Sequence, residues 1–132
     1  MPVLDTVVLF SAADEKDTWH VKAACYMRKL EDRDFYVATF ALLEFDVVLK
    51  SRGYSSDERM EKHGLLLRDF PNSGVKVSKL SPSTLYLTAR IEKEVGLEYF
   101  DAGVAAEALQ HDGSVVSTDE AFDRVAHLKR LW

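Results

Sequence analysis

Short apolar runs alternate along this chain with longer runs of helical character, and this alternation restricts the fold more than any other feature of the sequence. The apolar runs span residues 3–5, 35–38, 75–80 and 114–117. Strands that alternate with helices are typical of an α/β protein with a parallel sheet. We therefore predict an α/β fold with a central, mainly parallel sheet of four to five strands, to which residues 130–132 add a final edge strand.

Capping residues and turn residues predict the first helices. A short helix over residues 6–13 and a turn over 14–17 precede a helix that ends near residue 30, with an apolar side made of Val21, Ala24, Cys25 and Met27. A polar loop follows over residues 31–34. Thr39 is the expected N-cap of a helix over 40–52, and Ser56 is that of a helix ending near residue 70.

The second half of the chain repeats the pattern. A turn over residues 71–74 leads into the third apolar run, and Ser81-Pro82 begins a helix that ends at Gly96. Asp101 begins an alanine-rich helix that stops at residues 112–113, and a short helix is expected over 120–126.

Four acidic residues lie where such a sheet places its functional site. Asp5 closes the first strand, Asp101 begins a helix, Asp119 follows the strand over 114–117, and Glu44 lies one turn into its helix. Open α/β sheets bind ligands outside the carboxyl ends of their strands. Carboxylates gathered there raise one another's pKa, and Mg²⁺ or Mn²⁺ relieves the repulsion because both prefer oxygen ligands. The four acids therefore predict a metal-dependent hydrolase that acts on phosphate esters.

Each of these acids also has an ordinary structural explanation, because the chain holds 22 acidic residues. Asp5, Asp101 and Asp119 all suit a helix N-cap. Glu44 suits an exposed helix face beside the core residues Leu43 and Phe45. We favour the metal role for Asp5 because its surroundings are apolar.

Neighbouring polar residues extend the predicted site. Thr6 and Ser117 are candidates for holding water or a phosphate oxygen, with a cap or turn role as the alternative. Asp123 lies one helical turn after Asp119, so it is a candidate additional ligand, with a solvated helix face as the alternative. Asp46 points roughly opposite Glu44 and is expected to be peripheral.

Length and composition limit the class of protein. The 132 residues suit a single domain over 1–132, and 47% hydrophobic with 30% charged residues excludes a disordered chain. No apolar run is long enough to span a membrane, and no basic segment precedes the first apolar run, so we expect a cytoplasmic protein. The one cysteine, Cys25, excludes an intramolecular disulfide and is interpreted as a small buried residue.

Charge and the remaining side chains give little further indication of function. The formal net charge is −5, of which the four acids account for all but −1, so no basic footprint supports a nucleic-acid substrate. No histidine has a partner at zinc-ligand spacing, and we interpret all four as surface residues: His20, His63, His111 and His127. Trp19 and Trp132 are interpreted as packing or interface residues. The chain has neither a phosphate-binding glycine loop nor a nucleophile elbow.

In this order, the acidic motifs resemble those of the PIN-domain ribonucleases, over the whole chain. The matching parts are Val3-Leu4-Asp5-Thr6, Leu42-Leu43-Glu44, Phe100-Asp101-Ala102 and Val115-Val116-Ser117-Thr118-Asp119. Asp5, Glu44, Asp101 and Asp119 match the acidic positions of the family, and Ser117 matches its hydroxyl position. Val7 departs from it, because many members carry a small polar residue there. The compact size is similar to the stand-alone, VapC-type toxin branch of bacteria and archaea.

This resemblance implies a PIN-like three-layer α/β/α fold and Mg²⁺- or Mn²⁺-dependent endoribonuclease activity. It also implies a homodimer and, in many members, inhibition by a small antitoxin protein. The carboxylates would hold cations that lower the pKa of a bound water and stabilise charge on the RNA phosphate. Lys50 and Arg52 are candidates for holding flanking phosphates, although we favour a helix-dipole role for both.

Two other functions stay open at this point. One is a catalytically weak or silent PIN-like scaffold for dimerisation or RNA binding, and the presence of all four acids argues against it. The other is a phosphatase or phospho-acceptor domain with an aspartyl nucleophile. Such a domain would carry a lysine after a later strand, where this chain has Ser117-Thr118-Asp119.

Overall fold

A parallel sheet lies at the centre of the molecule, as predicted. The computed structural model describes residues 1–31 and 35–132, so part of the predicted loop over 31–34 lies outside the described residues. The sheet has the order β2-β1-β3-β4, with β1 at Val3–Leu4, β2 at Tyr36–Val37, β3 at Ser114–Val116 and β4 at Lys129–Leu131. All three strand pairs are parallel. The carboxyl ends of the strands therefore meet at one edge, where a ligand site is expected.

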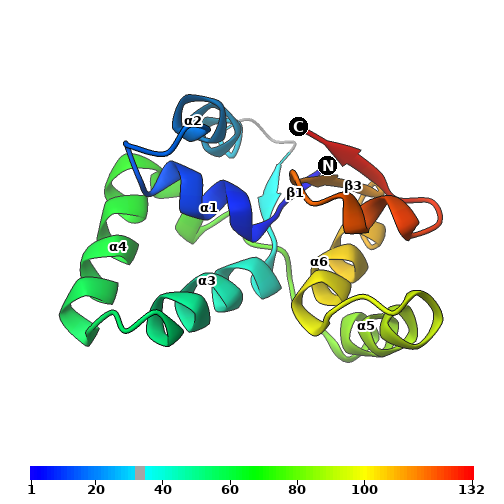
Figure 1. The fold of residues 1–132 in the computed structure, drawn as a ribbon. Helices are drawn as coiled ribbons and strands as arrows, with labels where there is room; N and C mark the ends of the chain where they lie inside the picture. The colour runs from blue at the N-terminus through cyan, green and yellow to red at the C-terminus, as the bar shows by residue number, and fades with distance from the viewer. Residues whose placement is uncertain (32–34) are drawn as a thin grey trace.

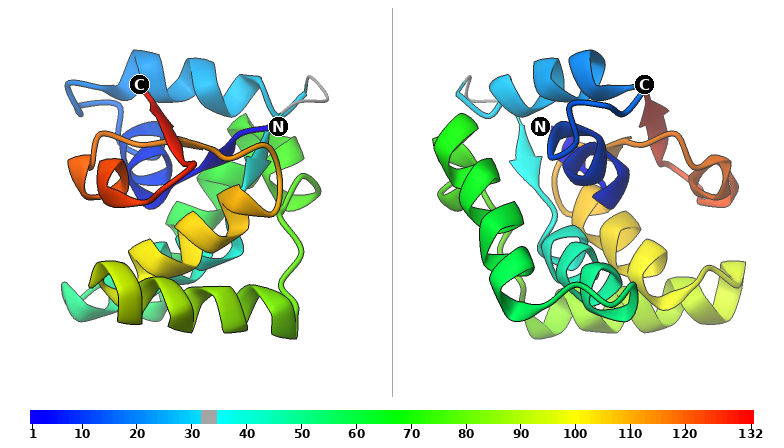
Figure 2. Two further views of the ribbon diagram at one scale, coloured as in Figure 1. Left: turned by 90° about the vertical axis from the view of Figure 1, so that its right-hand side faces the viewer. Right: turned by 60° about the vertical axis from the view of Figure 1, so that its left-hand side comes forward.

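Helices cover both faces of this sheet and give the three-layer α/β/α arrangement (Figure 1). In the described residues the helices are α1 (Thr6–Ala12), α2 (His20–Arg28), α3 (Thr39–Ser51), α4 (Ser56–Asp69), α5 (Pro82–Val95) and α6 (Tyr99–Leu109). Two short 3₁₀ helices, η1 (Pro71–Gly74) and η2 (Glu120–Arg124), complete the list. On one face α6 packs against β1 and β3 with α5 outside it, and on the other α1 packs with α2. Further views show α3 and α4 as a pair of consecutive helices to one side of the sheet (Figure 2).

The core extends over both faces of the sheet, and part of it lies between the strands and α6. Val3, Leu4, Val115 and Val116 are fully buried, as expected for short parallel strands covered on both faces. Every residue of α6 from 102 to 108 is buried, and most of them are small. Small side chains let this helix approach its neighbours closely, which brings the first turn of α6 beside the carboxyl ends of the strands.

The predicted third strand over residues 75–80 is wrong. Only one parallel bridge forms there, between Val37 and Val77. The Val37 N–H donates to the Lys76 carbonyl and the Ser78 N–H to the Val37 carbonyl, both at 2.8 Å. The segment touches the edge of β2 and then turns toward α5. Val75 precedes this contact, points outward and is 77% exposed.

Two predicted caps are also wrong. The helix α3 begins at Thr39 itself, with Ala38 at the N-cap position and no capping side chain from either residue. The Thr39 hydroxyl instead donates to the backbone carbonyl of Ser78. For α4 the cap is Ser55 rather than Ser56, because Ser55 forms a reciprocal capping box with Glu58.

The other predicted boundaries differ less. α5 is capped by Ser81 and ends at Gly96, which has a left-handed φ of 77°. α6 begins at Tyr99, so Asp101 lies within its first turn instead of at the cap. The predicted helix over 120–126 is the 3₁₀ helix η2, and the predicted final edge strand is β4, shifted to begin at Lys129.

The predicted apolar side of α2 is only partly correct. Ala23, Ala24 and Met27 are buried, but Val21 is 76% exposed. Cys25 is exposed too, so its interpretation as a buried residue is wrong. Helical rotation turns Val21 and Cys25 to one outer face, because they are four residues apart.

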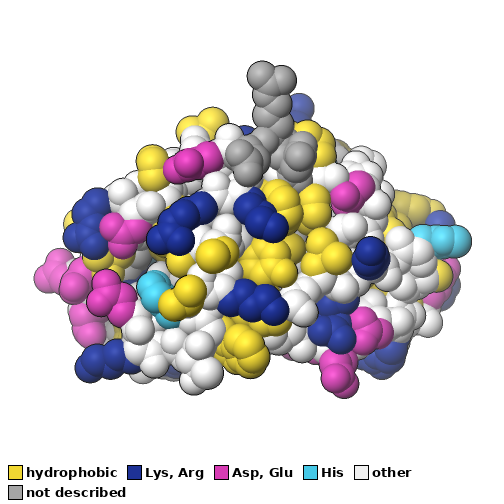
Figure 3. Space-filling view, turned by 90° about the horizontal axis from the view of Figure 1, so that it is seen from above, with side chains coloured by type: hydrophobic (Ala, Val, Ile, Leu, Met, Phe, Trp, Pro, Cys, Tyr) yellow, Lys and Arg dark blue, Asp and Glu magenta, His cyan; other side chains and the backbone are white. Residues whose placement is uncertain are grey.

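The interpretation of all four histidines as surface residues is only partly correct. Of the four, His127 alone is exposed. The other three are half-buried, and each has a hydrogen-bond partner: Ser11 for His20, Asp46 for His63 and Ser78 for His111. Trp19 and Trp132 pack edge to face at 6.0 Å, as the packing interpretation predicted. Lysine and arginine side chains lie among hydrophobic ones on the face seen from above (Figure 3). None of the described helices is long and apolar enough to cross a membrane.

Candidate metal centre

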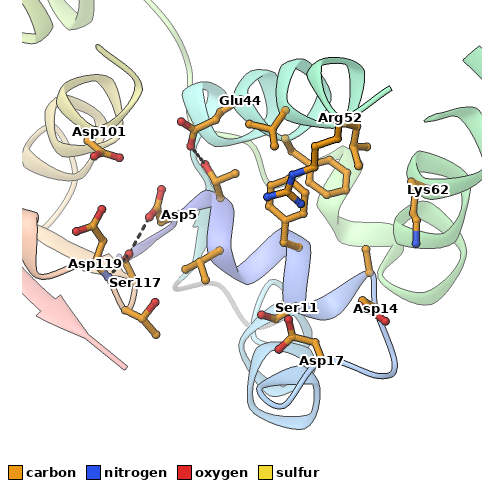
Figure 4. Close-up of a pocket in the computed structure, with 18 of the residues that line it drawn as sticks. Asp5, Ser11, Asp14, Asp17, Glu44, Arg52, Lys62, Asp101, Ser117 and Asp119 are labelled. Carbon is orange, nitrogen blue, oxygen red and sulfur yellow. Dashed lines mark hydrogen bonds between the residues drawn. The ribbon is translucent and has the colours of Figure 1, made fainter. Parts of the chain in front are cut away.

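A cleft of about 610 Å³ opens at the carboxyl ends of β1 and β3. Asp5, Glu44, Asp101 and Asp119 all line it, from the end of β1, from α3, from the first turn of α6 and from the segment after β3 (Figure 4). The structure therefore places the predicted site residues at the same edge of the sheet. Their helices and strands are far apart in the chain and meet only through the parallel topology.

Three of the four acids form a tight group. Asp5, Glu44 and Asp101 each offer a carboxylate oxygen within 4.8 Å of the others. Asp119 lies outside this group at the rim of the cleft, and its Oδ1 accepts the Ala121 N–H at 2.9 Å as the cap of η2. Asp119 therefore caps η2 and lines the cleft at the same time.

The carboxyl groups raise one another's pKa, and burial contributes most. Burial raises the pKa of Asp101 to about 7, with further contributions from Asp5, Asp119, Glu44 and Glu98. Burial also raises the pKa of Asp5 to about 6, although its hydrogen bond from Ser117 acts in the opposite direction. The pKa of Glu44 is raised mainly by burial, and its hydrogen bond from Thr6 opposes this. A positive charge placed among these groups would offset the cost of ionising them.

Asp5 is held by one oxygen only. It is 5% exposed, and its Oδ2 accepts the Ser117 hydroxyl at 2.7 Å. Its Oδ1 is buried and has no hydrogen-bond partner in the part of the chain that the structure describes. An unpartnered buried carboxylate oxygen is costly unless a cation or a water satisfies it. The orphaned oxygen and the oxygen-only donor set both fit Mg²⁺ or Mn²⁺.

The hydroxyl groups of Thr6 and Ser117 each contact an acid of the tight group. Thr6 donates its hydroxyl hydrogen bond to Glu44 at 2.5 Å, and Ser117 donates to Asp5 while accepting the Asp119 N–H at 3.0 Å. Both hydroxyl protons are therefore committed to carboxylates, not to water or phosphate. Each hydroxyl orients one acid of the tight group.

The structure does not bring Asp123 or Asp46 to the cleft. Asp123 is exposed and forms a two-bond pair with Arg130, at 2.9 and 3.1 Å. Asp46 pairs with Arg59 and His63 on the outer side of α3, which agrees with its predicted peripheral place. These partners hold the pKa of both aspartates below the usual range.

Sequence reasoning missed charged residues of the cleft, among them Glu98 and Lys62. Glu98 lines it and helps to raise the pKa of Glu44 and Asp101. Glu98 is the extended N-cap residue of α6, and the predicted start of this helix at Asp101 left it outside the helix. At the other end, Arg52 and Lys62 line the cleft, whereas the exposed Lys50 does not. The Arg52 guanidinium lies 5.0 Å from the ring centre of Phe10.

Comparison with known proteins identifies the family. The PIN domain model matches residues 3–128. The chain belongs to the PIN-domain family. PIN domains are generally nucleases that use divalent metals, which agrees with the acidic cleft of this PIN domain. None of the curated proteins matches the chain.

Two solved structures share the PIN fold of this chain. One is FitAcB from Neisseria gonorrhoeae, with a TM-score of 0.73, 21% identity, and coverage of 98% of this chain and 96% of that chain. The other is VapBC2 from Rickettsia felis, solved bound to a DNA fragment from their promoter, with a TM-score of 0.69, 12% identity and the same coverage. At such identities the likeness shows the fold alone.

Proposed function

We propose that this protein is a Mg²⁺- or Mn²⁺-dependent endoribonuclease that hydrolyses RNA phosphodiester bonds at the acidic cleft. The observation that carries the proposal is the tight group of Asp5, Glu44 and Asp101, which each offer a carboxylate oxygen within 4.8 Å of the others, together with the Oδ1 of Asp5, unpartnered among the described residues. Membership in a family of nucleases supports it further. We also propose that the protein works in the cytoplasm as a homodimer.

The residues of the cleft divide the work. Asp5, Glu44 and Asp101 would hold the cation, and Asp119 at the rim would complete the set or orient the attacking water. Ser117 and Thr6 keep the Asp5 and Glu44 carboxylates turned toward the site. When bound, a divalent cation acidifies water and stabilises negative charge on phosphate oxygens. In the hydrolysis, the water oxygen loses a proton and forms a bond to phosphorus, while the bond to one ribose oxygen breaks and that oxygen takes up a proton.

The far end of the cleft offers a second contact for RNA. Arg52 and Lys62 line it and would bind phosphates that flank the scissile one. The aromatic ring of Phe10 supports the Arg52 guanidinium there. Asp14 and Asp17 line the same end, so the attraction would be local and sensitive to salt.

We further propose that the protein is the toxin of a toxin–antitoxin pair, with a small antitoxin protein as partner. The resemblance of its motifs to the VapC-type branch and its shared fold with chains of VapBC2 and FitAcB support this role. Co-expression with the product of a neighbouring small reading frame tests it. The two proteins should co-purify, and the second should relieve growth arrest caused by the first.

Incubation of the purified protein with a mixed RNA pool, followed by sequencing of the new ends, tests the nuclease activity. Cleavage should require Mg²⁺ or Mn²⁺, stop with EDTA, and fall by orders of magnitude in Asp5→Asn and Asp119→Asn. Asp123→Asn is the matched control, because Asp123 is exposed and pairs with Arg130 outside the cleft. Cleavage that survives EDTA or both substitutions would refute the mechanism. Mn²⁺ binding without cleavage of any RNA would favour the silent scaffold.

A further inference from the structure

Glu107 is a fully buried carboxylate that does not line the cleft. It lies in the interior of α6, among alanines, with an exposure of 0%. Both of its oxygens accept backbone hydrogen bonds from a different helix. The Thr39 N–H donates to Oε1 at 2.8 Å, and the Phe40 N–H donates to Oε2 at 3.1 Å.

These two bonds supply the cap that α3 lacks. The first N–H groups of a helix have no partner within the helix, and Ala38 at the N-cap position has no side-chain acceptor. Glu107 meets two of those donors from outside, with a charge of the sign that a helix N-terminus favours. Burial raises the pKa of Glu107, and the bonds from Phe40 and Thr39 act against that rise.

A second contact fixes the start of α3 on α6. Gly103 lies one helical turn before Glu107 on α6, and the ring of Phe40 rests directly on it. A Cβ at Gly103 would lie 2.3 Å from ring atoms of Phe40. The ring of Phe40 therefore packs on Gly103 and its N–H donates to Glu107. Together these two contacts fix how the start of α3 packs on α6.

The packing of α3 on α6 also determines the relative position of two residues of the tight acidic group. Asp101 lies in the first turn of α6 and Glu44 in the second turn of α3. The distance between their carboxylates depends on how α3 sits on α6, because each side chain projects from its own helix. A small rotation of α3 about its first turn would carry Glu44 away from Asp101.

We infer that Glu107 is a positioning residue for the metal centre, which holds the start of α3 against α6 so that Glu44 and Asp101 face one cation. The inference rests on the proposed function, since it concerns the same site. Glu107 itself contacts neither cation nor substrate.

Measurement of Mn²⁺ affinity by electron paramagnetic resonance, well below the melting temperature, tests the inference. In Glu107→Gln the amide can accept only one of the two N–H groups, and its NH₂ faces the other. The dissociation constant for Mn²⁺ should rise about 10–100-fold, the usual effect of losing a residue that orients a metal ligand. Thr84→Val is the control, because Thr84 is also fully buried and hydrogen-bonded but lies on α5. It should lower stability and leave the affinity unchanged.

A double-mutant cycle separates positioning from general loosening. In a Glu44→Gln background, Glu107→Gln should change the Mn²⁺ dissociation constant by less than about twofold, because the ligand that it positions is already altered. Full additivity of the two substitutions would overturn the inference. So would an unchanged dissociation constant in Glu107→Gln alone.

Crystal structures of the metal-free wild type and Glu107→Gln provide a readout that needs no metal. The carboxylate of Glu44 should lie farther from that of Asp101 in the variant. An unmoved Glu44 would overturn the inference even if the wild type bound no Mn²⁺. Absence of Mn²⁺ binding by the wild type would instead refute the proposed function.

Discussion

Ser117 donates its hydroxyl hydrogen bond to Oδ2 of Asp5 across 2.7 Å, and this bond joins the end of β3 to the end of β1. It determines which oxygen of Asp5 faces the cleft, because Oδ1 is left buried and without a partner in the described part of the chain. One oxygen of Asp5 is thus used for positioning and the other is left for a ligand.

Removal of this bond should loosen the site. We expect Ser117→Ala to weaken Mn²⁺ binding about 10-fold or more and to lower the free energy of unfolding by about 1 kcal/mol. Titration calorimetry measures the first and urea unfolding the second. Ser114→Ala, at the other end of β3, is the control and should leave Mn²⁺ affinity unchanged. Equal affinities of wild type and Ser117→Ala would contradict the assigned role.

Neutralising one member of the acidic group should stabilise the metal-free protein. Asp101→Asn removes a charge whose ionisation is opposed by burial and by four other acids of the cleft, so the melting temperature in EDTA should rise. A gain of 1 kcal/mol corresponds to about 3–5 °C for a chain of this size. Added Mg²⁺ should raise the melting temperature of the wild type more than that of the variant, because binding stabilises only the state with an intact site. Equal Mg²⁺ effects would count against a shared site.

The same pKa shifts predict how stability depends on pH without metal. The pKa values of Asp5, about 6, and Asp101, about 7, lie above the ordinary value of 3.8, so the folded state binds more protons than the unfolded chain in between. Their contribution to the free energy of unfolding therefore falls as pH rises from about 4 to 7 and is constant above that range. Urea unfolding in EDTA across this range should show a shallower fall in Asp101→Asn. An identical pH dependence in both proteins would refute the assignment.

Arg52 and Lys50 make a matched pair for RNA binding. Both end the helix that carries Glu44, but only Arg52 lines the cleft. Arg52→Ala should weaken binding of a fluorescent single-stranded RNA about 10-fold, as expected for the loss of a charge-assisted phosphate contact, and Lys50→Ala should have little effect. Fluorescence anisotropy with Ca²⁺ in place of Mg²⁺ or Mn²⁺ measures both. A larger loss in Lys50→Ala would place the RNA elsewhere.

Two glycines should respond to alanine in opposite directions. Gly103→Ala places a Cβ 2.3 Å from atoms of the Phe40 ring, so overpacking should destabilise the protein by about 1–3 kcal/mol or more. Gly64 lies in α4 with no atom within 4 Å of an added Cβ, so Gly64→Ala should stabilise it by about 0.5–1 kcal/mol. Thermal unfolding of both variants checks this. Similar losses in both would mean that Phe40 moves aside at little cost.

Part of the site could be predicted from sequence because a parallel sheet imposes it. Asp5 and Asp119 follow strands whose carboxyl ends must meet at one edge, so their proximity follows from the order of elements alone. Glu44 has no such signal, since a glutamate in a helix is ordinarily solvated. Its position one turn into a helix does not determine its neighbours, and the packing of α3 on α6 brings its carboxylate within 4.8 Å of that of Asp101.

Helix starts show where local patterns stop being sufficient. Thr39 has the right side chain for an N-cap, yet its hydroxyl bonds to Ser78 and the start of α3 is capped by Glu107. These partners lie 39 and 68 residues away along the chain. A local rule cannot weigh an acceptor that a different helix delivers.

The sequence by itself determined the alternation of strands and helices, and with it the edge of the sheet where the acids gather. Short-range periodicity and capping residues carry that information, because both act within a few residues. The tertiary structure alone decided which oxygen of Asp5 has no partner among the described residues, and that Asp123 pairs with Arg130 instead of entering the cleft. It also decided that Glu107 caps the start of α3. The free oxygen of Asp5 and the contacts of Glu107 depend on burial and on partners from distant segments, because an unpaired polar group is costly away from water. The Asp123–Arg130 pair depends on the packing of β4 beside η2.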